Sequence, residues 1–104
     1  MSYHVYVLRS GTDDQNYVGC TNNLKRRFEE HNSGKVFSTK NRIPLALIYV
    51  ETHLNRDGAF SREKFLKSGW GKNYLKKVMK NYLHDLQTFS SEKVRKVESK
   101  KLGG

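Results

Sequence analysis

Two short runs rich in β-branched and aromatic residues open the hydrophobic pattern of the chain. Residues 3–9 alternate loosely between apolar and polar positions, and residues 17–20 form a second run of the same kind. The stretch 11–16 between them is polar and carries the Gly, Asp and Asn residues that favour tight turns. This pattern predicts a β-hairpin. Gly19 interrupts the second strand, at a point where a helix begins or a ligand approaches closely.

A helical pattern follows the hairpin directly. Leu24, Phe28 and His31 recur at i, i+4 and i+7, which is the spacing of one helix face. One of the two asparagines before Leu24 provides the N-cap, and a Ser-Gly pair after the last turn provides the stop. We therefore predict a helix over residues 22–32.

The middle of the chain is a basic loop followed by an apolar run. The loop contains Lys35, Lys40 and Arg42 and ends at the single proline. Residues 45–50 are almost continuously apolar, which is typical of a strand covered on both faces. The sequence thus predicts a third strand that is buried on both sides.

Two further helices are predicted beyond this strand. The first begins at Asn55 or Asp57 and ends at the serine and glycines of residues 68–71. The second runs over residues 72–86, where large apolar side chains recur at helical spacing.

The predicted elements define one domain and a tail. Residues 87–104 are polar and basic with few large apolar side chains, which predicts a flexible C-terminal tail. Residues 1–86 form the single domain. Its fold class is α/β (α+β), a small three-stranded antiparallel sheet flanked by about three helices.

The net charge changes the functional picture more than any other global property. Twenty Lys and Arg residues against ten acidic ones give a formal charge of +10 at pH 7. A polyanion is therefore the expected partner, and phosphate backbones carry charge at the required density. A charge surplus that serves only solubility is the alternative interpretation.

The remaining composition excludes several classes of protein. The single cysteine, Cys20, cannot form an internal disulfide, and no Cys/His cluster has zinc spacing. No apolar run approaches the roughly 20 residues of a membrane span, and the N-terminus lacks the apolar segment of a signal peptide. These features predict a protein of the reducing cytoplasm without a membrane partner.

Glu63 is the one acidic residue among seven basic ones in residues 62–80. It lies three residues from both Phe60 and Leu66, on the apolar side of a predicted helix. A carboxylate there must be paired, hydrogen-bonded or bound to a metal ion. One interpretation is an exposed ion pair with Lys67 at i+4. The other is a ligand of a hard divalent cation that is completed by waters and substrate phosphate.

Four other side chains have both a structural and a chemical interpretation. Arg27 is either a solvated charge among basic neighbours or a bidentate clamp on a phosphate. Tyr6 and Tyr17 are either cross-strand aromatic neighbours or phenols that orient or deprotonate a water. His31, on the Leu24 face, is either a satisfied core histidine or a catalyst.

Together and in this order, these residues closely resemble the motifs of the GIY-YIG nuclease superfamily. Tyr6 and Tyr17 match the two motif tyrosines, and Gly19 matches the motif glycine. The resemblance covers residues 1–83. It is greatest to the small stand-alone bacterial branch, which is similar to the nuclease domain of the excision-repair endonuclease. One departure is His4, which stands where the name motif has glycine.

The rest of the motif set falls on the two predicted helices. Arg27 matches the catalytic arginine, and His31 occupies the His/Tyr position one turn later. Glu63 matches the metal-binding glutamate, and Asn73 matches the last polar position of the family.

The resemblance implies a metal-dependent endonuclease that hydrolyses phosphodiester bonds in DNA, or in RNA, by structure rather than sequence. Glu63 would hold Mg²⁺ or Mn²⁺, and Arg27 would neutralise charge on the phosphoryl oxygens. Tyr6, Tyr17 or His31 would position or activate the attacking water.

Further residues are predicted to contact the substrate around that centre. The flanking backbone would be held by Lys35, Lys40, Arg42, Lys64, Lys67, Lys72 and Asn73. Phe37 or Trp70 would stack on an unpaired base, and the alternative for Trp70 is a core plug between helices.

Two other functions are compatible with the same residues. One is a nucleic-acid-binding module that retains the nuclease fold without catalysis, and the other is an interaction protein for an acidic partner. Because the chain carries no added specificity domain, either the shape of the substrate or a partner protein supplies the selectivity.

Overall fold

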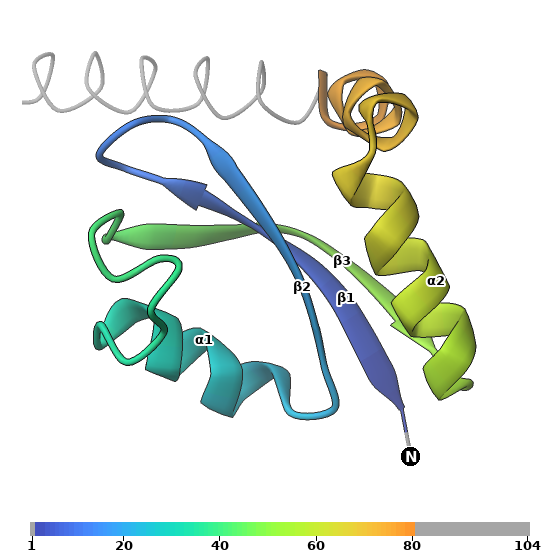
Figure 1. The fold of residues 1–104 in the computed structure, drawn as a ribbon, viewed down its shortest axis with the longest axis horizontal. Helices are drawn as coiled ribbons and strands as arrows, with labels where there is room; N and C mark the ends of the chain where they lie inside the picture. The colour runs from blue at the N-terminus through green and yellow to red at the C-terminus, as the bar shows by residue number, and fades with distance from the viewer. Residues whose placement is uncertain (1, 81–104) are drawn as a thin grey trace, which may run out of the picture. The chain divides into compact units, whose positions relative to one another are not determined.

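A three-stranded antiparallel sheet forms the centre of the fold. The computed structural model describes residues 2–80, and within them β1 (Tyr3–Ser10), β2 (Asn16–Thr21) and β3 (Leu45–His53) pair in the order β2-β1-β3 (Figure 1). β1 and β2 form the predicted hairpin, with Tyr6 opposite Gly19. Both the sheet and the hairpin are therefore confirmed.

β1 is the buried strand, because it lies between the other two. Its residues Val5, Val7 and Leu8 are fully buried. β3 was predicted to be covered on both faces, and this is wrong: it is an edge strand, and its Val50 is 38% exposed. A continuous apolar run is compatible with either position, since a short strand at the edge of a small sheet still buries part of each side chain.

An irregularity in the pairing of β1 with β3 lets β3 serve both faces of the sheet. The register shifts between Val7, which pairs with Tyr49, and Leu8, which pairs with Leu47. The extra residue of such a bulge reverses which face the following side chains occupy. As a result Leu47 lies on the face of Leu8, whereas Tyr49 lies on the opposite face, that of Val7.

Helix α1 (Leu24–Asn32) covers the Leu8 face of the sheet. The Asn23 side chain accepts a hydrogen bond from the Arg26 amide at 3.1 Å and caps the helix. The buried cluster of this face contains Tyr6, Leu8 and Leu45, and partly buried side chains packed against it are Tyr17, Leu24, Phe28 and Leu47. The predicted cap, stop and apolar face are all confirmed within one or two residues.

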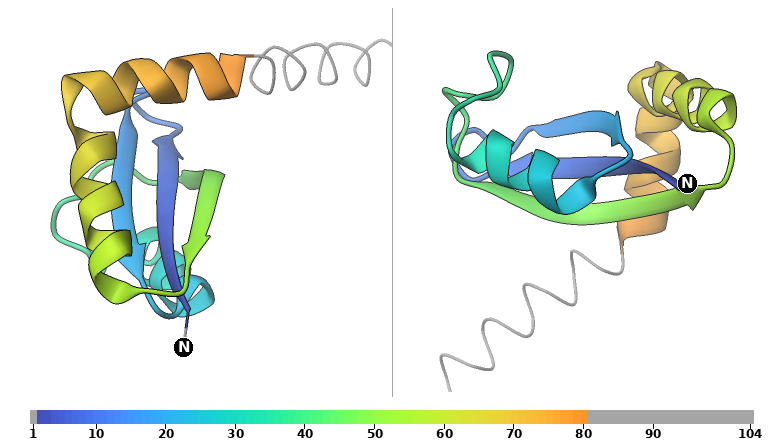
Figure 2. Two further views of the ribbon diagram at one scale, coloured as in Figure 1. Left: turned by 90° about the vertical axis from the view of Figure 1, so that its right-hand side faces the viewer. Right: turned by 90° about the horizontal axis from the view of Figure 1, so that it is seen from below.

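Helix α2 (Arg56–Lys67) lies on the other side of the sheet from α1 (Figures 1 and 2). Asn55 caps it by accepting a hydrogen bond from the Gly58 amide at 2.9 Å. Ala59 and Leu66 are its fully buried residues. Because these two are seven residues apart, the helix presents a single narrow stripe to the protein.

The helix that follows begins earlier than predicted. Only Ser68 interrupts the helical path, and residues 69–80 are helical again, so Gly71 lies inside the helix and does not end its predecessor. A Cβ at Gly71 would stand 2.0 Å from the Phe65 carbonyl oxygen, so the glycine permits a close approach of two backbone segments. Trp70 is 82% exposed, which rules out the core plug.

The chain divides into two compact units, Met1–Lys72 and Asn73–Gly104, and the first contains the sheet, α1 and α2. The predicted end of the last helix at residue 86, the domain boundary there and the tail 87–104 lie outside the described residues. Across residues 2–80, no helix is both long and apolar enough to span a bilayer.

Candidate active site

Tyr6 stands at the centre of the predicted site residues. It is 1% exposed, and its hydroxyl lies 2.9 Å from His31 Nε2. Gly19 on the neighbouring strand lies directly against the phenol, because a Cβ there would stand 2.3 Å from the Tyr6 hydroxyl oxygen. Gly19 is thus required for steric room, and any larger residue would displace Tyr6.

His31 joins Tyr6 to the basic loop between α1 and β3. Its second ring nitrogen, Nδ1, lies 2.7 Å from the Thr39 hydroxyl, and both His31 and Thr39 are fully buried. Burial, together with the nearby Arg27 guanidinium, lowers the pKa of His31. A neutral imidazole has one donor and one acceptor nitrogen, so the two hydroxyls satisfy it completely.

Tyr17 and Arg27 lie between this buried chain and the surface. The Tyr17 ring is 5.0 Å from the His31 ring and 6.5 Å from the Tyr6 ring. The Arg27 guanidinium hydrogen-bonds the Tyr6 hydroxyl, and its Nη1 lies 3.5 Å from a Glu30 carboxylate oxygen. The Arg27 side chain is 37% exposed, so one side of the guanidinium remains open to solvent.

The environment of Tyr6 opposes ionisation of its phenol. Burial raises its pKa to about 12, with the Tyr17 and Glu63 side chains acting in the same direction and the Arg27 hydrogen bond acting against them. At neutral pH the Tyr6 hydroxyl therefore stays protonated. It can orient its neighbours, but as a free phenol it does not act as a base.

Glu63 reaches this group from α2. It affects the pKa of the Tyr6 hydroxyl and, with burial, raises that of the Cys20 thiol on β2, so it lies near both. Its side chain is only 20% exposed, and a carboxylate oxygen lies 3.5 Å from Lys67 Nζ. The ion pair with Lys67 is thus present, but on a largely buried carboxylate rather than an exposed one.

The donor set at Glu63 matches one type of metal site. Among residues 2–80 no cluster of three His, Cys, Asp or Glu side chains could hold a metal ion. That excludes a cage built wholly from protein ligands in this part of the chain. A single carboxylate fits Mg²⁺ or Mn²⁺, which commonly keep several waters and complete their shell with substrate phosphate.

The same residues match a known catalytic domain. Residues 2–80 correspond to the GIY-YIG catalytic domain. The chain belongs to the GIY-YIG family. It is 36% identical over 93 residues to a UPF0213 protein of Clostridium perfringens, covering 88% of this chain and 87% of the relative. It is 38% identical over 65 residues to a UPF0213 protein of Bacillus cereus, covering 62% and 68%.

A solved structure is also similar. The solution NMR structure of a UPF0213 protein from Bacillus halodurans is 30% identical, covers 75% of this chain and 85% of that chain, and gives a TM-score of 0.49. The predicted resemblance to a GIY-YIG nuclease domain is confirmed by the family match.

The predicted substrate-binding residues of this GIY-YIG chain are not all equally available. Lys35, Lys40, Lys64 and Lys72 are exposed. Arg42 is held instead by the hairpin turn, because its Nε lies 3.2 Å from an Asp13 carboxylate oxygen. Lys67 is paired with Glu63. Asn73 is exposed and belongs to the second unit.

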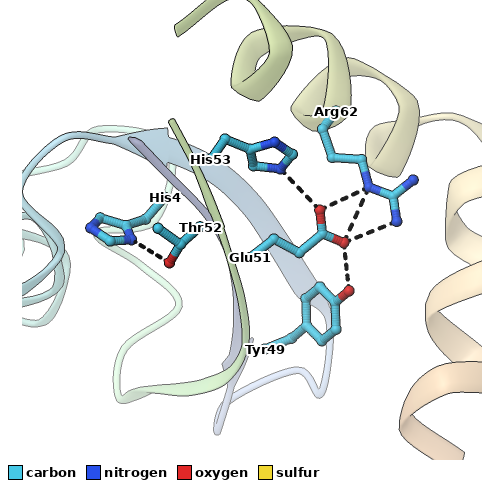
Figure 3. Close-up of polar contacts among 6 residues, drawn as sticks. All are labelled: His4, Tyr49, Glu51, Thr52, His53 and Arg62. Carbon is cyan, nitrogen blue, oxygen red and sulfur yellow. Dashed lines mark hydrogen bonds and ion pairs between the residues drawn. The ribbon is translucent and has the colours of Figure 1, made fainter. Parts of the chain in front are cut away.

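A second polar cluster lies on the α2 face of the sheet (Figure 3). Glu51 accepts hydrogen bonds from Arg62 Nε at 2.9 and 3.1 Å and from Arg62 Nη2 at 2.9 Å, and a further one from the Tyr49 hydroxyl. His53 Nε2 lies 3.2 Å from the same carboxylate. Burial alone would raise the pKa of Glu51, but these donors outweigh it and hold the pKa below its usual range. We call these four residues the Glu51 cluster.

Sequence reasoning missed the Glu51 cluster, and Thr39 as well. Tyr49, Glu51 and His53 alternate along β3, a signal that was available but was overlooked because the apolar run ends at Val50. Thr39 had no such signal, since its role depends on how the loop folds back onto His31.

Proposed function

We propose that this chain is a divalent-metal-dependent endonuclease that hydrolyses phosphodiester bonds in DNA. The observation that carries the proposal is the meeting of four groups: Arg27 bound to the Tyr6 hydroxyl, Tyr17 against them, and the largely buried Glu63 close by. A guanidinium beside a weakly paired carboxylate suits a phosphate and a cation better than it suits a closed core.

Arg27 contacts the scissile phosphate. Its guanidinium is planar and presents two parallel N–H donors to phosphate oxygens, while the Tyr6 hydroxyl holds it from behind. Its charge offsets the negative charge that develops on the phosphoryl oxygens in the transition state. The Glu30 carboxylate holds Arg27 until substrate takes its place.

Tyr17 positions the attacking water, and Tyr6 and His31 act through their neighbours. Tyr6 and His31 are almost wholly buried, whereas Tyr17 is only partly buried and lies beside Arg27. The Tyr6–His31–Thr39 chain therefore fixes Arg27 and the Tyr17 ring in place. Tyr6 and His31 are positioning residues in this account.

Glu63 is the residue that would hold Mg²⁺ or Mn²⁺. When bound there, such a cation polarises the phosphate and stabilises the leaving oxygen. The Lys67 pair does not prevent this, since a single contact to a half-exposed ammonium is weak and readily exchanged.

Binding around the centre is electrostatic. The exposed lysines 35, 40, 64 and 72 contact the flanking phosphates, and the net charge of +10 attracts the polymer over longer distances. Such contacts position a backbone and do not distinguish sequences. Selectivity therefore comes from the shape of the nucleic acid or from a partner protein.

A cleavage assay on the full chain tests the proposal. Supercoiled plasmid and a panel of nicked, flapped, branched and linear DNAs are incubated with Mg²⁺ or with EDTA. We expect cleavage with Mg²⁺ only, and faster cleavage of some shapes than of others. Salt-dependent binding of the whole panel with no cleavage under any divalent cation would instead indicate a binding module that retains the fold.

A further inference from the structure

The basic loop between α1 and β3 carries an aromatic side chain in an unusual setting. Phe37 is 84% exposed, whereas Val36 before it is 8% exposed and Thr39 after it is fully buried. Backbone hydrogen bonds fix the turn on both sides, from the Thr39 amide to the Val36 carbonyl at 3.1 Å and from the Arg42 amide to the Thr39 carbonyl at 2.9 Å. Phe37 is therefore held outward by an anchored turn.

A cation accompanies the ring. Lys40 Nζ lies 4.7 Å from the centre of the Phe37 ring, which is the geometry of a cation–π contact. Because the ring is largely exposed, it still offers surface to a second planar group. An ammonium beside an aromatic surface matches the chemistry of one nucleotide, in which a base is joined to a negatively charged phosphate.

This pair is tied to the candidate active site. Thr39 lies between Phe37 and Lys40 in the sequence and bonds to His31, which in turn contacts Tyr6. Two residues span at most about 7 Å of chain, so the Phe37 backbone lies close to that hydrogen bond. A strand held at Arg27 therefore passes within reach of the Phe37 ring.

We propose that Phe37 and Lys40 form a stacking site for an unpaired base of DNA close to the scissile phosphate. The proposal rests on the proposed function for the location of that phosphate. Inside a duplex both faces of each base are covered by its neighbours, so a protein ring can stack only on a base that is unpaired, terminal or flipped out. The site thus selects DNA with an unpaired base beside the cleaved bond.

The test is a binding comparison in EDTA, so that it does not depend on cleavage. The probes are a fully paired duplex and the same duplex with one bulged 2-aminopurine, whose emission falls when it stacks. We expect wild type to prefer the bulged duplex and to quench its emission. Phe37→Ala should lose roughly 5- to 100-fold in affinity for the bulged duplex and little for the paired one.

Three variants give the experiment its controls. Phe37→Tyr should retain the preference, and Phe37→Leu should lose it, because leucine keeps apolar volume without a π face. Phe60→Ala removes the ring of another cation–π pair, with Arg56 at 5.3 Å, that sits on α2, and should change nothing. Since Phe37 is so exposed, these changes leave the fold intact.

The outcomes separate the two proposals. Equal affinities of wild type and Phe37→Ala for the bulged duplex, or equal losses on both duplexes, overturn the stacking site and leave the nuclease proposal standing. A Phe37-dependent preference in a protein that never cleaves DNA supports the stacking site while the nuclease proposal fails.

Discussion

The two polar clusters of this small sheet differ in how fully their charges are satisfied. In the Glu51 cluster, both carboxylate oxygens accept hydrogen bonds, and a bidentate arginine supplies most of them. In the candidate active site, Arg27 shares itself between a phenol and Glu30, and Glu63 meets a single lysine. A satisfied ion pair holds elements together, whereas an unsatisfied one has capacity left for a charged ligand.

The two clusters are also connected through α2. Arg62 and Glu63 are adjacent in that helix, so their side chains project about 100° apart. The bidentate contact of Arg62 with Glu51 on β3 fixes the rotation of the helix. That contact thereby determines where Glu63 lies. We infer that the Glu51 cluster supports the site without taking part in its chemistry.

The largest effect is expected at Arg27, where a charge with open capacity meets the substrate. Arg27→Ala should lower single-turnover cleavage by a hundredfold or more, about 3 to 4 kcal/mol, with little change in DNA affinity. Arg26→Ala is the matched control, because Arg26 is exposed and points about 100° away. It should weaken binding slightly and leave the saturated rate unchanged; equal effects of the two changes on that rate would refute the assignment of Arg27.

The helix caps and the hairpin show how far local sequence determines this fold. Asn23, Asn55 and the polar turn act on their immediate neighbours, so their effects could be predicted from the sequence. The edge position of β3 could not, because burial of an apolar run depends on which strand pairs with it. Gly71 likewise serves a close contact with Phe65, which no local pattern reveals.

The candidate site was predictable in its residues but not in their exposure. The spacing of Tyr6, Tyr17, Arg27 and Glu63 identified the group through a family resemblance. The burial of Tyr6 beneath Gly19 and the link from His31 to Thr39 arise only from tertiary packing. For this reason the sequence left three candidates for the water-positioning group, and exposure favours Tyr17.

The next largest effect separates the exposed tyrosine from the buried one. Tyr17→Phe should slow cleavage on the order of tenfold to a hundredfold by misplacing the water, and should leave thermal stability nearly unchanged. Tyr6→Phe deprives buried His31 and Arg27 of a partner and should lower the free energy of unfolding by about 1 to 3 kcal/mol. Paired measurements of rate and thermal unfolding on both variants check this. A stability loss in Tyr17→Phe together with none in Tyr6→Phe would reverse the two assignments.

A smaller effect is expected from acid. The pKa of Glu51 is lowered in the folded state, so its contribution to stability is present above the ordinary glutamate pKa and is lost as the pH falls through the folded value. Glu51→Gln should therefore remove part of the acid-induced loss of stability in that range. The loss that begins near pH 6.5 from His31, whose pKa is also lowered, should remain.

Urea unfolding of wild type and Glu51→Gln between pH 3 and 8 measures this difference. Asp13→Asn breaks the more exposed ion pair with Arg42 and serves as the control. It should cost less than Glu51→Gln at neutral pH, since Asp13 is 41% exposed and Glu51 is 17% exposed. Parallel pH curves for wild type and Glu51→Gln would mean that Glu51 has no special role.

The most direct test compares the two carboxylates side by side. Glu63→Gln and Glu51→Gln are each measured for Mg²⁺-dependent cleavage at saturating DNA and for thermal unfolding. The account predicts opposite outcomes: Glu63→Gln abolishes cleavage and keeps its stability, while Glu51→Gln loses stability and still cleaves at saturating Mg²⁺. Full cleavage by Glu63→Gln, or the same loss of cleavage in both variants at a temperature where both are folded, would contradict it.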